Sequence, residues 1–208
     1  MSKQWLRYIA PLMADATEIN GLVGLNLNEA KINLSDPAKT RLRGQLELDT
    51  IRLIAGPLTN QLIQSVQQIN SIGKVFSGQP ASREPSTILK MPKQSINFSV
   101  ANQIVAHERL LLDVDRAQVI TNGQVSFDGQ MNLTAMVPLD ARWLGSDLQR
   151  LAGQTLSLPI RGTLDRPLLD ATNLSRVLAD LGIQAIQKNA ESYLEEQLNR
   201  GIEKLFGN

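Results

Sequence analysis

The chain has 208 residues, 42% of them hydrophobic, and a formal net charge of +1, from 21 Lys and Arg against 20 Asp and Glu. This length and apolar content suffice for a buried core, whereas the near-neutral charge and the 4% aromatic content argue against nucleic acid as a partner. Cysteine is absent, which excludes disulfides, thiol catalysis and thiolate metal ligands.

The first residues predict a short amphipathic helix rather than a signal peptide. Arg7 interrupts a hydrophobic run that is already too short for secretion, and no run in the chain reaches the roughly 18 apolar residues that span a bilayer. If the protein works outside the cytoplasm, we expect its targeting signal to lie elsewhere, in a longer chain. One side of the predicted helix carries Trp5, Leu6, Ile9, Leu12 and Met13.

Two strands are predicted before residue 54. The segment GLVGLNLNEAKINL, residues 21–34, alternates between apolar and polar side chains in two blocks, with a bulge or turn near Asn28 and Glu29. Ser35, Asp36 and Pro37 then end it. The segment TRLRGQLELDTIRL, residues 40–53, places leucines on one face and charged residues on the other, which indicates a half-solvated antiparallel strand.

A helix is predicted from Pro57 through residue 76, because proline fits a first helical position and apolar residues recur there at helical spacing. The following segment, residues 77–92, is rich in Ser, Pro and Gly and predicts a mobile loop. It separates two possible strand-helix halves, 1–78 and 92–208, of what we expect to be a single domain over 1–208.

Further strands are predicted over residues 94–100, 103–114, 118–129 and 130–139, with Asp128 and Gly129 as a hairpin turn. A short helix is expected over 140–153 and a last strand over 154–164, where Pro159 favours an edge position. We expect Pro167 to end the pairing of this strand, so that the chain leaves the sheet.

From Asn173 the apolar spacing predicts a long helix to the end of the chain, bent near Gly182. The fold class expected is therefore α+β: an antiparallel, β-rich, curved or groove-like sheet packed with amphipathic helices, with a long C-terminal helix. The apolar stripe of that helix could dock on the rest of a longer chain or on another copy. Its docking candidates are Leu174, Leu178, Leu181, Ile186, Leu194, Leu198, Ile202 and Leu205.

Catalytic chemistry has little support in the sequence. His107 and Glu108 are neighbours in a predicted strand and so point to opposite faces, and the histidine is interpreted as solvent-facing or as a hydrogen-bonded strand residue. Asp113 and Asp115 share a face, but their spacing is more simply that of a turn. A hydrolase using these residues is the third hypothesis, and we predict no catalytic residues, no cofactor and no metal.

Aliphatic strand faces are the remaining feature, and two interpretations of them stay open. They form either an ordinary closed core or an open groove that holds acyl chains, because both predict the same alternation. If a groove exists, the candidate lipid-contacting residues are Ile96, Phe98, Val100, Val125, Phe127, Leu133, Ala135 and Val137.

Three segments taken together resemble the C-terminal region of large AsmA-like envelope proteins, relatives of TamB: residues 8–48, VSFDGQMNLTAMVPL (125–139) and LSLPIRGTLDRPLLD (156–170). The resemblance implies a segment of a long protein anchored in the inner membrane, lying on the periplasmic side of a bacterial cell envelope. It also implies non-enzymatic phospholipid binding or transport and a part in outer-membrane assembly. The chain departs from that group in lacking the anchor and the long repetitive β region.

Overall fold

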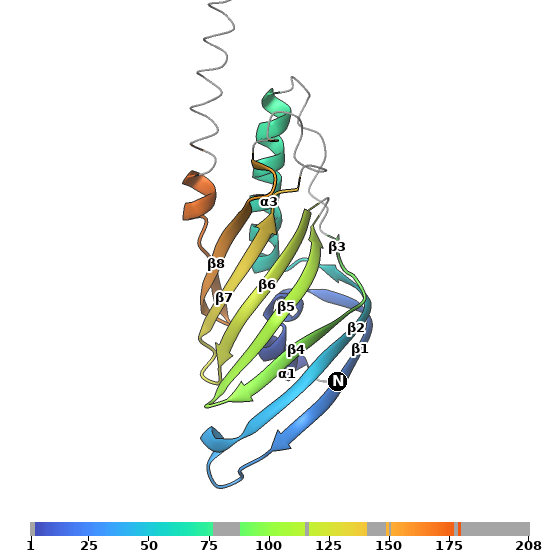
Figure 1. The fold of residues 1–208 in the computed structure, drawn as a ribbon, viewed down its shortest axis with the longest axis vertical. Coiled ribbons are helices and arrows are strands. Elements are labelled where there is room, and N and C mark those ends of the chain that lie inside the picture. Colours follow the sequence, from blue (N-terminus) through green and yellow to red (C-terminus); the bar gives the residue numbers. More distant parts are fainter. Residues whose placement is uncertain are drawn as a thin grey trace, which may run out of the picture. The chain divides into compact units, whose positions relative to one another are not determined.

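The computed structural model describes residues 3–76, 88–114, 117–140, 149, 151–176 and 179. Residues Met1–Ala171 form one compact unit and Thr172–Asn208 form a second. In the first unit, the strands before residue 77 and from residue 88 onward belong to one sheet, drawn in Figure 1. The loop predicted over 77–92 is wrong at residues 88–91, which form a strand of this sheet, and residues 77–87 lie outside the described residues. Its elements are α1 (Lys3–Ile9), α2 (Pro11–Asp15), β1 (Glu18–Lys31), the 3-10 helix η1 (Pro37–Lys39), β2 (Arg41–Ile54), α3 (Pro57–Phe76), β3 (Ile88–Met91), β4 (Gln94–Ala101), β5 (Ile104–Val114), β6 (Ala117–Ser126), β7 (Met131–Pro138), β8 (Thr155–Thr163) and β9 (Arg166–Leu169).

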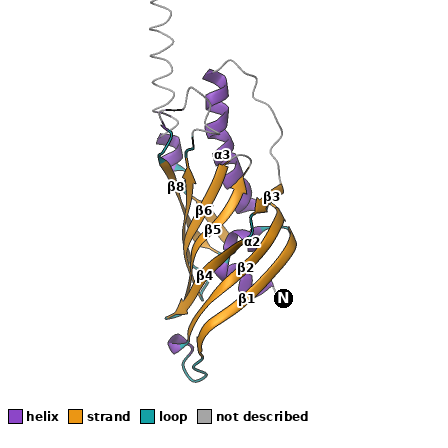
Figure 2. Cartoon of the chain, turned by 45° about the vertical axis from the view of Figure 1, so that its right-hand side comes forward, coloured by secondary structure: helices purple, strands orange, loops and turns teal. Residues whose placement is uncertain are grey.

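The sheet is an antiparallel meander in which strands adjacent in the sequence pair with each other. Its order is β1-β2-β3-β5-β6-β7-β8-β9, with β4 also placed between β2 and β5. β3 and β4 pair with successive parts of β2, so they act as one strand interrupted at Pro92, which has no N–H to donate. Figures 1 and 2 show the helices α1, α2 and α3 on one side of the sheet, which we call its inner face.

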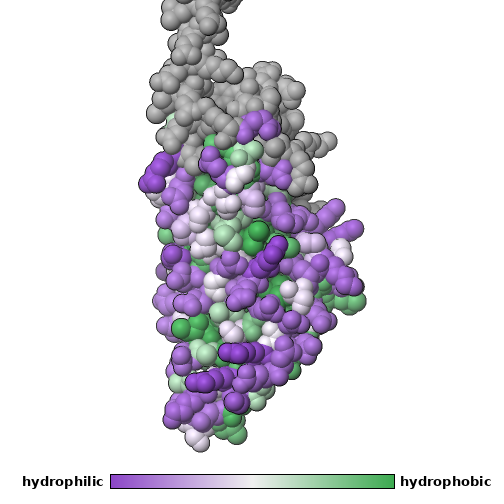
Figure 3. All heavy atoms as spheres, in the orientation of Figure 1, coloured by the Kyte–Doolittle hydropathy of each residue, from purple (hydrophilic) through white to green (hydrophobic). Residues whose placement is uncertain are grey.

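Alternation along the strands places the core on the inner face. In β2, Leu46 and Leu48 are buried, whereas Arg43 and Glu47 are exposed, and β4, β6 and β7 follow the same period of two. The outer face, which Figure 3 shows, is mostly hydrophilic with scattered apolar residues. The sheet therefore has one solvated side and one side packed on helices.

The helices on the inner face are joined by a cap that connects distant parts of the sequence. The carboxylate of Asp15, at the end of α2, accepts hydrogen bonds from the backbone N–H groups of Leu58 and Thr59 at 3.2 and 2.8 Å and from the Thr59 hydroxyl at 2.7 Å. The first turn of α3 thus receives its acceptor from another helix. Pro57 opens α3 as predicted.

A bulge in β5 is bridged by side chains from its neighbours. Between His107 and Leu110 the register shifts, and Arg109 has a φ of 51°. The carboxamide of Gln94 exchanges two hydrogen bonds of 2.8 Å with the backbone of Leu111, and Asn122 accepts the Arg109 N–H at 2.7 Å. These amides replace backbone bonds that the bulge interrupts.

The expected α+β class is wrong. The described part of the chain is mostly antiparallel β-sheet, because nearly every long segment is a strand joined to its neighbour by a short turn that needs no helix. The long C-terminal helix is also not found among the described residues: helix covers 172–176 and recurs at 179. Residues 177–178 and 180–208, over which it was expected to continue, lie outside them.

Two details of the last strands also differ from expectation. β8 is not an edge strand, since Pro159 lies opposite Thr134 of β7 and the carbonyl of Pro159 accepts the N–H of Asp170 at 2.8 Å. Pro167 does not end the pairing, because it lies within β9 and is registered with Gly162. The segment Leu164–Asp165 is a hairpin turn between these strands. The helix expected over 140–153 falls mostly outside the described residues.

Candidate functional site

The inner face over the middle of the sheet is closed. Of the eight residues proposed to contact lipid, seven are buried: Ile96, Phe98, Val100, Val125, Leu133, Ala135 and Val137. Phe127 is 42% exposed, and its ring makes an edge contact with Tyr8 of α1 at a centroid distance of 6.2 Å. The sequence left open whether these residues line a closed core or an open groove. The seven buried positions form a packed core.

His107 is part of this core. It is 2% exposed, its Nε2 lies 3.3 Å from the Thr121 hydroxyl, and its Nδ1 has no hydrogen-bond partner within the described part of the chain. Burial lowers the pKa of His107 from its ordinary value of 6.5 to about 4. The expectation of a solvent-facing or fully hydrogen-bonded histidine is wrong, because His107 alternates in register with the buried Val105 on the inner face, whereas its neighbour Glu108 is exposed.

Of the two aspartate candidates, Asp113 is the one that lies among the described residues. Asp113 accepts a hydrogen bond from the Gln118 side chain at 3.3 Å, and Asp115 lies outside the described residues. Over the described ranges, no group of three His, Asp or Glu side chains is placed to hold a metal ion. None of the described helices is both long and apolar enough to cross a membrane.

Most docking candidates of the C-terminal stripe fall outside the residues that the structure describes. Leu174 lies in the helical segment 172–176 and is buried. Leu178, Leu181, Ile186, Leu194, Leu198, Ile202 and Leu205 lie outside the described residues.

A cavity of about 340 Å³ lies between α1, α2, the start of α3 and the β8–β9 turn. Its polar groups already have partners: Asp15 caps α3, and the guanidinium of Arg7 pairs with Asp165. Its other walls come from residues such as Met131 and Leu164. The cavity lies between the N-terminal helices and the sheet. Its charged side chains, Arg7, Asp15 and Asp165, all have partners, so none is free for chemistry.

Exposed apolar side chains gather instead in the β1–β2 hairpin. Leu25 and Leu27 lie on the inner face of β1, opposite the buried residues Leu46 and Gly44 of β2, yet they are 39% and 49% exposed. In the loop that follows, Ile32 is 66% and Leu34 is 91% exposed. The sequence pattern predicts a strand at these residues but not their exposure, because alternation does not show where the helices that cover a sheet end.

The loop that carries Leu34 is built by polar side chains. The side-chain oxygen of Asn33 accepts the N–H groups of Ser35 and Asp36 at 3.1 and 2.8 Å, and Asp36 in turn accepts the N–H of Ala38 at 3.1 Å. Such turns are typical of Asn and Asp, which replace missing backbone partners. They fix the loop so that Leu34 points to solvent.

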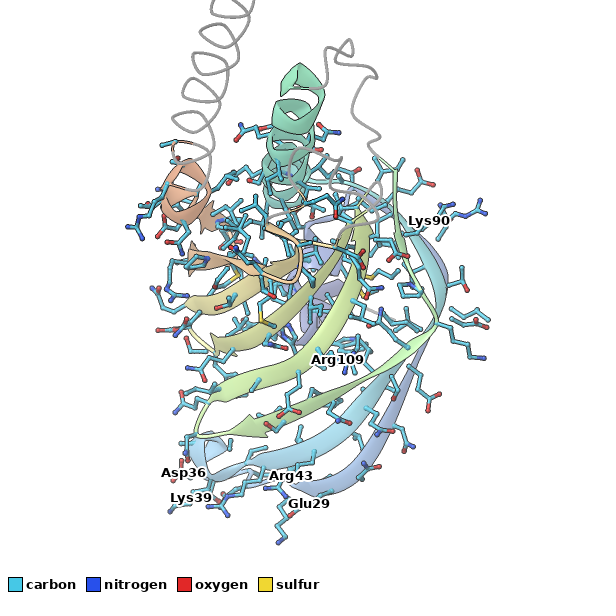
Figure 4. All side chains as sticks on the ribbon, turned by 45° about the horizontal axis from the view of Figure 1, so that its top comes forward. Glu29, Asp36, Lys39, Arg43, Lys90 and Arg109 are labelled. Atoms are coloured by element: carbon cyan, nitrogen blue, oxygen red, sulfur yellow. The ribbon has the colours of Figure 1, made fainter. Side chains whose placement is uncertain are left out.

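Positive charge surrounds this apolar loop. Lys31 and Lys39 form ion pairs with Glu29 and Asp36 at 3.3 and 3.2 Å, whereas Arg41 and Arg43 take part in no ion pair among the described residues. Figure 4 shows Glu29, Asp36, Lys39 and Arg43 gathered at this end of the sheet, far from Lys90 and Arg109. We call the tip of this hairpin the hairpin-tip patch. It consists of Leu25 and Leu27 on the inner face, Arg41 and Arg43 on the outer face, and Lys31, Ile32, Leu34 and Lys39 at the loop.

A hollow of about 320 Å³ adjoins the patch. Its lining includes both the cationic Arg41 and Arg43 and the apolar Leu42 and Val100. The surface can therefore meet an anionic group through guanidinium donors and an apolar chain through its leucines.

Comparisons with protein-family models, with curated proteins and with solved structures found no match for this chain.

Proposed function

We propose that this chain is a non-enzymatic cell-envelope module that contacts phospholipid through the hairpin-tip patch. The observation that carries the proposal is Leu34, an apolar side chain that is 91% exposed and held outward by a hydrogen-bonded loop. Exposing a leucine to water costs free energy that burial in an acyl layer recovers, up to about 3 kcal/mol for a full side chain. Arg41 and Arg43, whose guanidinium groups form no ion pair with the residues that the structure describes, are the proposed partners for lipid phosphate.

This proposal moves the lipid contact from the middle of the sheet to its β1 end. The residues first expected to line a groove are occupied in the core, whereas Leu25 and Leu27 continue the same inner face beyond its covered part. An acyl chain on these leucines would lie on the protein surface next to the core and would not insert into the core. The likeness to AsmA-like proteins agrees with such a role and remains part of the proposal.

Flotation with lipid vesicles tests the apolar half of the patch. Vesicles of phosphatidylcholine with added phosphatidylglycerol should carry the unmodified chain upward. Leu34→Asp should lower the bound fraction about tenfold or more, because it removes an apolar anchor and introduces a negative charge that the anionic vesicle repels. Leu22→Asp is the matched control, because Leu22 is also in β1 and 72% exposed but lies on the outer face. Unchanged flotation of Leu34→Asp, or no flotation of the unmodified chain, contradicts the proposal.

Salt dependence tests the cationic half. Replacing Arg41 and Arg43 with Gln should flatten the loss of binding with rising ionic strength and reduce the preference for phosphatidylglycerol over phosphatidylcholine alone. Both arginines are exposed, so folding should not change. If the double variant keeps the full preference for anionic vesicles, the arginines do not meet the phosphate.

A further inference from the structure

The two edges of the sheet differ in how well they are protected. β9 has four residues and contains Pro167, which cannot donate to a further strand. β1 has 14 residues, and among the described strands it pairs on one side alone, with β2. It forms the lateral edge seen in Figures 1 and 2.

The middle of β1 lacks the features that usually block pairing at an edge. Residues 19–27, INGLVGLNL, contain no charge and no proline. At the first register shift the extra residue is in β2, where Thr50 has a φ of 44°, and Gly21 of β1 opposite it has a φ of 141°. At the second shift the extra residue is Asn28, which follows this stretch. No residue is inserted in β1 from Ile19 to Leu27, so its side chains keep alternate faces there, and among the described strands the backbone groups on the side away from β2 have no strand partner.

We propose that this edge pairs with β1 of a second copy of the chain, antiparallel and centred on Val23. A twofold axis perpendicular to the sheet relates two such strands, so each residue faces a partner residue on the same side of the joined sheet. In this register the whole uninterrupted stretch is used. The pairs are Val23 with Val23, Leu22 with Gly24, Gly21 with Leu25, Asn20 with Asn26, and Ile19 with Leu27.

The composition of the strand favours this self-pairing. Each glycine lies opposite a leucine, so a large side chain meets a position without one, and a Cβ at Gly24 would have nothing closer than 3.4 Å within its own chain. Asn20 and Asn26 are both exposed and both polar, and they can exchange hydrogen bonds across the pair. Leu22, 72% exposed on the outer face, gains the surface of its partner's Gly24.

Pairing would place the inner faces of both copies on one side. The exposed Leu25 and Leu27 of the two chains would then form one continuous apolar strip across the joint. The dimer does not depend on the proposed lipid contact, since it is made by backbone groups and by residues 19–27. Ile32 and Leu34, which lie beyond this stretch, stay accessible in it.

Introduced cysteines test both the pairing and its register, because the natural chain has none. An equal mixture of Asn20→Cys and Asn26→Cys chains should give a disulfide between copies several-fold faster under mild oxidation than either variant alone, since paired residues lie within disulfide distance only in the mixture. Both positions are exposed, so the fold should tolerate the changes. Leu168→Cys, 64% exposed on the β9 edge, measures random collision.

Sedimentation equilibrium of the unmodified chain provides the second measurement. A dimer that is weakened by Val23→Asp and restored by mixing Val23→Asp with Val23→Lys supports the proposal, because like charges would meet only at the twofold axis. A monomeric chain overturns it. So does cross-linking of Asn20→Cys with itself at the rate of the mixture, or cross-linking of Leu168→Cys at that rate.

Discussion

Two polar side chains, the half-buried Asp15 and the buried His107, show how single residues shape this molecule in opposite ways. The carboxylate of Asp15 receives three hydrogen bonds from the first turn of α3 and so stabilises a helix that starts 42 residues later. The ring of His107 receives one contact and leaves Nδ1 without a partner in the core. The first residue contributes to stability, whereas the second makes it depend on pH.

Removing the Asp15 carboxylate should destabilise the fold. Asp15→Ala leaves the Leu58 and Thr59 N–H groups without their acceptor, and we expect a loss of about 1–2 kcal/mol in urea unfolding, as for other helix caps. Asp15→Asn keeps a side-chain oxygen and should lose less. Equal stability of Asp15→Ala and the unmodified chain would show that the cap does not contribute.

Acid should destabilise the protein through His107. Its pKa is about 4 in the folded chain and near 6.5 when unfolded, so between these values the unfolded chain binds the proton more strongly, and stability falls as pH falls. The full loss is about 3 kcal/mol, present below pH 4 and absent above pH 6.5. Urea unfolding at pH 6.5 and pH 5 checks this, and His107→Leu should show a much smaller difference between the two. If the free energy of unfolding of His107→Leu changes with pH as much as that of the unmodified chain, other groups cause the pH dependence.

At the scale of elements, the β1–β2–β4 junction depends on a glycine where strands approach closely. Gly44 lies opposite Leu27 of β1 and Phe98 of β4, and the ring of Phe98 covers it on the inner face. A Cβ at Gly44 would lie 2.3 Å from the Asn26 backbone oxygen and 3.0 Å from the Phe98 ring. The close approach of Gly44 to Asn26 and Phe98 holds β1 and β2, which carry the hairpin-tip patch, against β4.

Gly44→Ala should therefore weaken this junction. Overpacking of this kind typically costs about 1–3 kcal/mol, and part of the cost should appear as faster amide hydrogen exchange in β1 and β2. Gly24→Ala is the control, because its Cβ would meet the Glu47 Cβ at an ordinary 3.4 Å. If both variants are equally stable, the Phe98 contact relaxes without loss.

For the whole molecule, the described sheet has one end packed on helices and one end uncovered. The middle of the inner face is filled by α1, α2 and α3, and the buried aliphatic residues there have no access to a ligand. The β1–β2 hairpin extends past this cover with its leucines exposed. Both proposals, lipid contact at the hairpin tip and pairing at the β1 edge, follow from this uneven cover.

The sequence by itself determined most of the local structure. Period-two alternation identified β2 and the strands of residues 94–139, Pro57 marked the start of α3, and Asp128–Gly129 the β6–β7 turn. These features depend on neighbouring residues, whose pattern is visible in the chain. The same locality explains the error at Pro159, since a proline shows a missing donor but not whether the strand lies at an edge.

Only the tertiary structure decided which apolar residues are covered. Phe98 and Leu27 look alike in alternation, yet one is 5% and the other 49% exposed, because the helices lie over one part of the inner face and not over the other. The predominance of sheet over helix and the burial of His107 likewise depend on contacts between distant segments. Burial is a property of what packs on a face, and a strand pattern records only that the face is apolar.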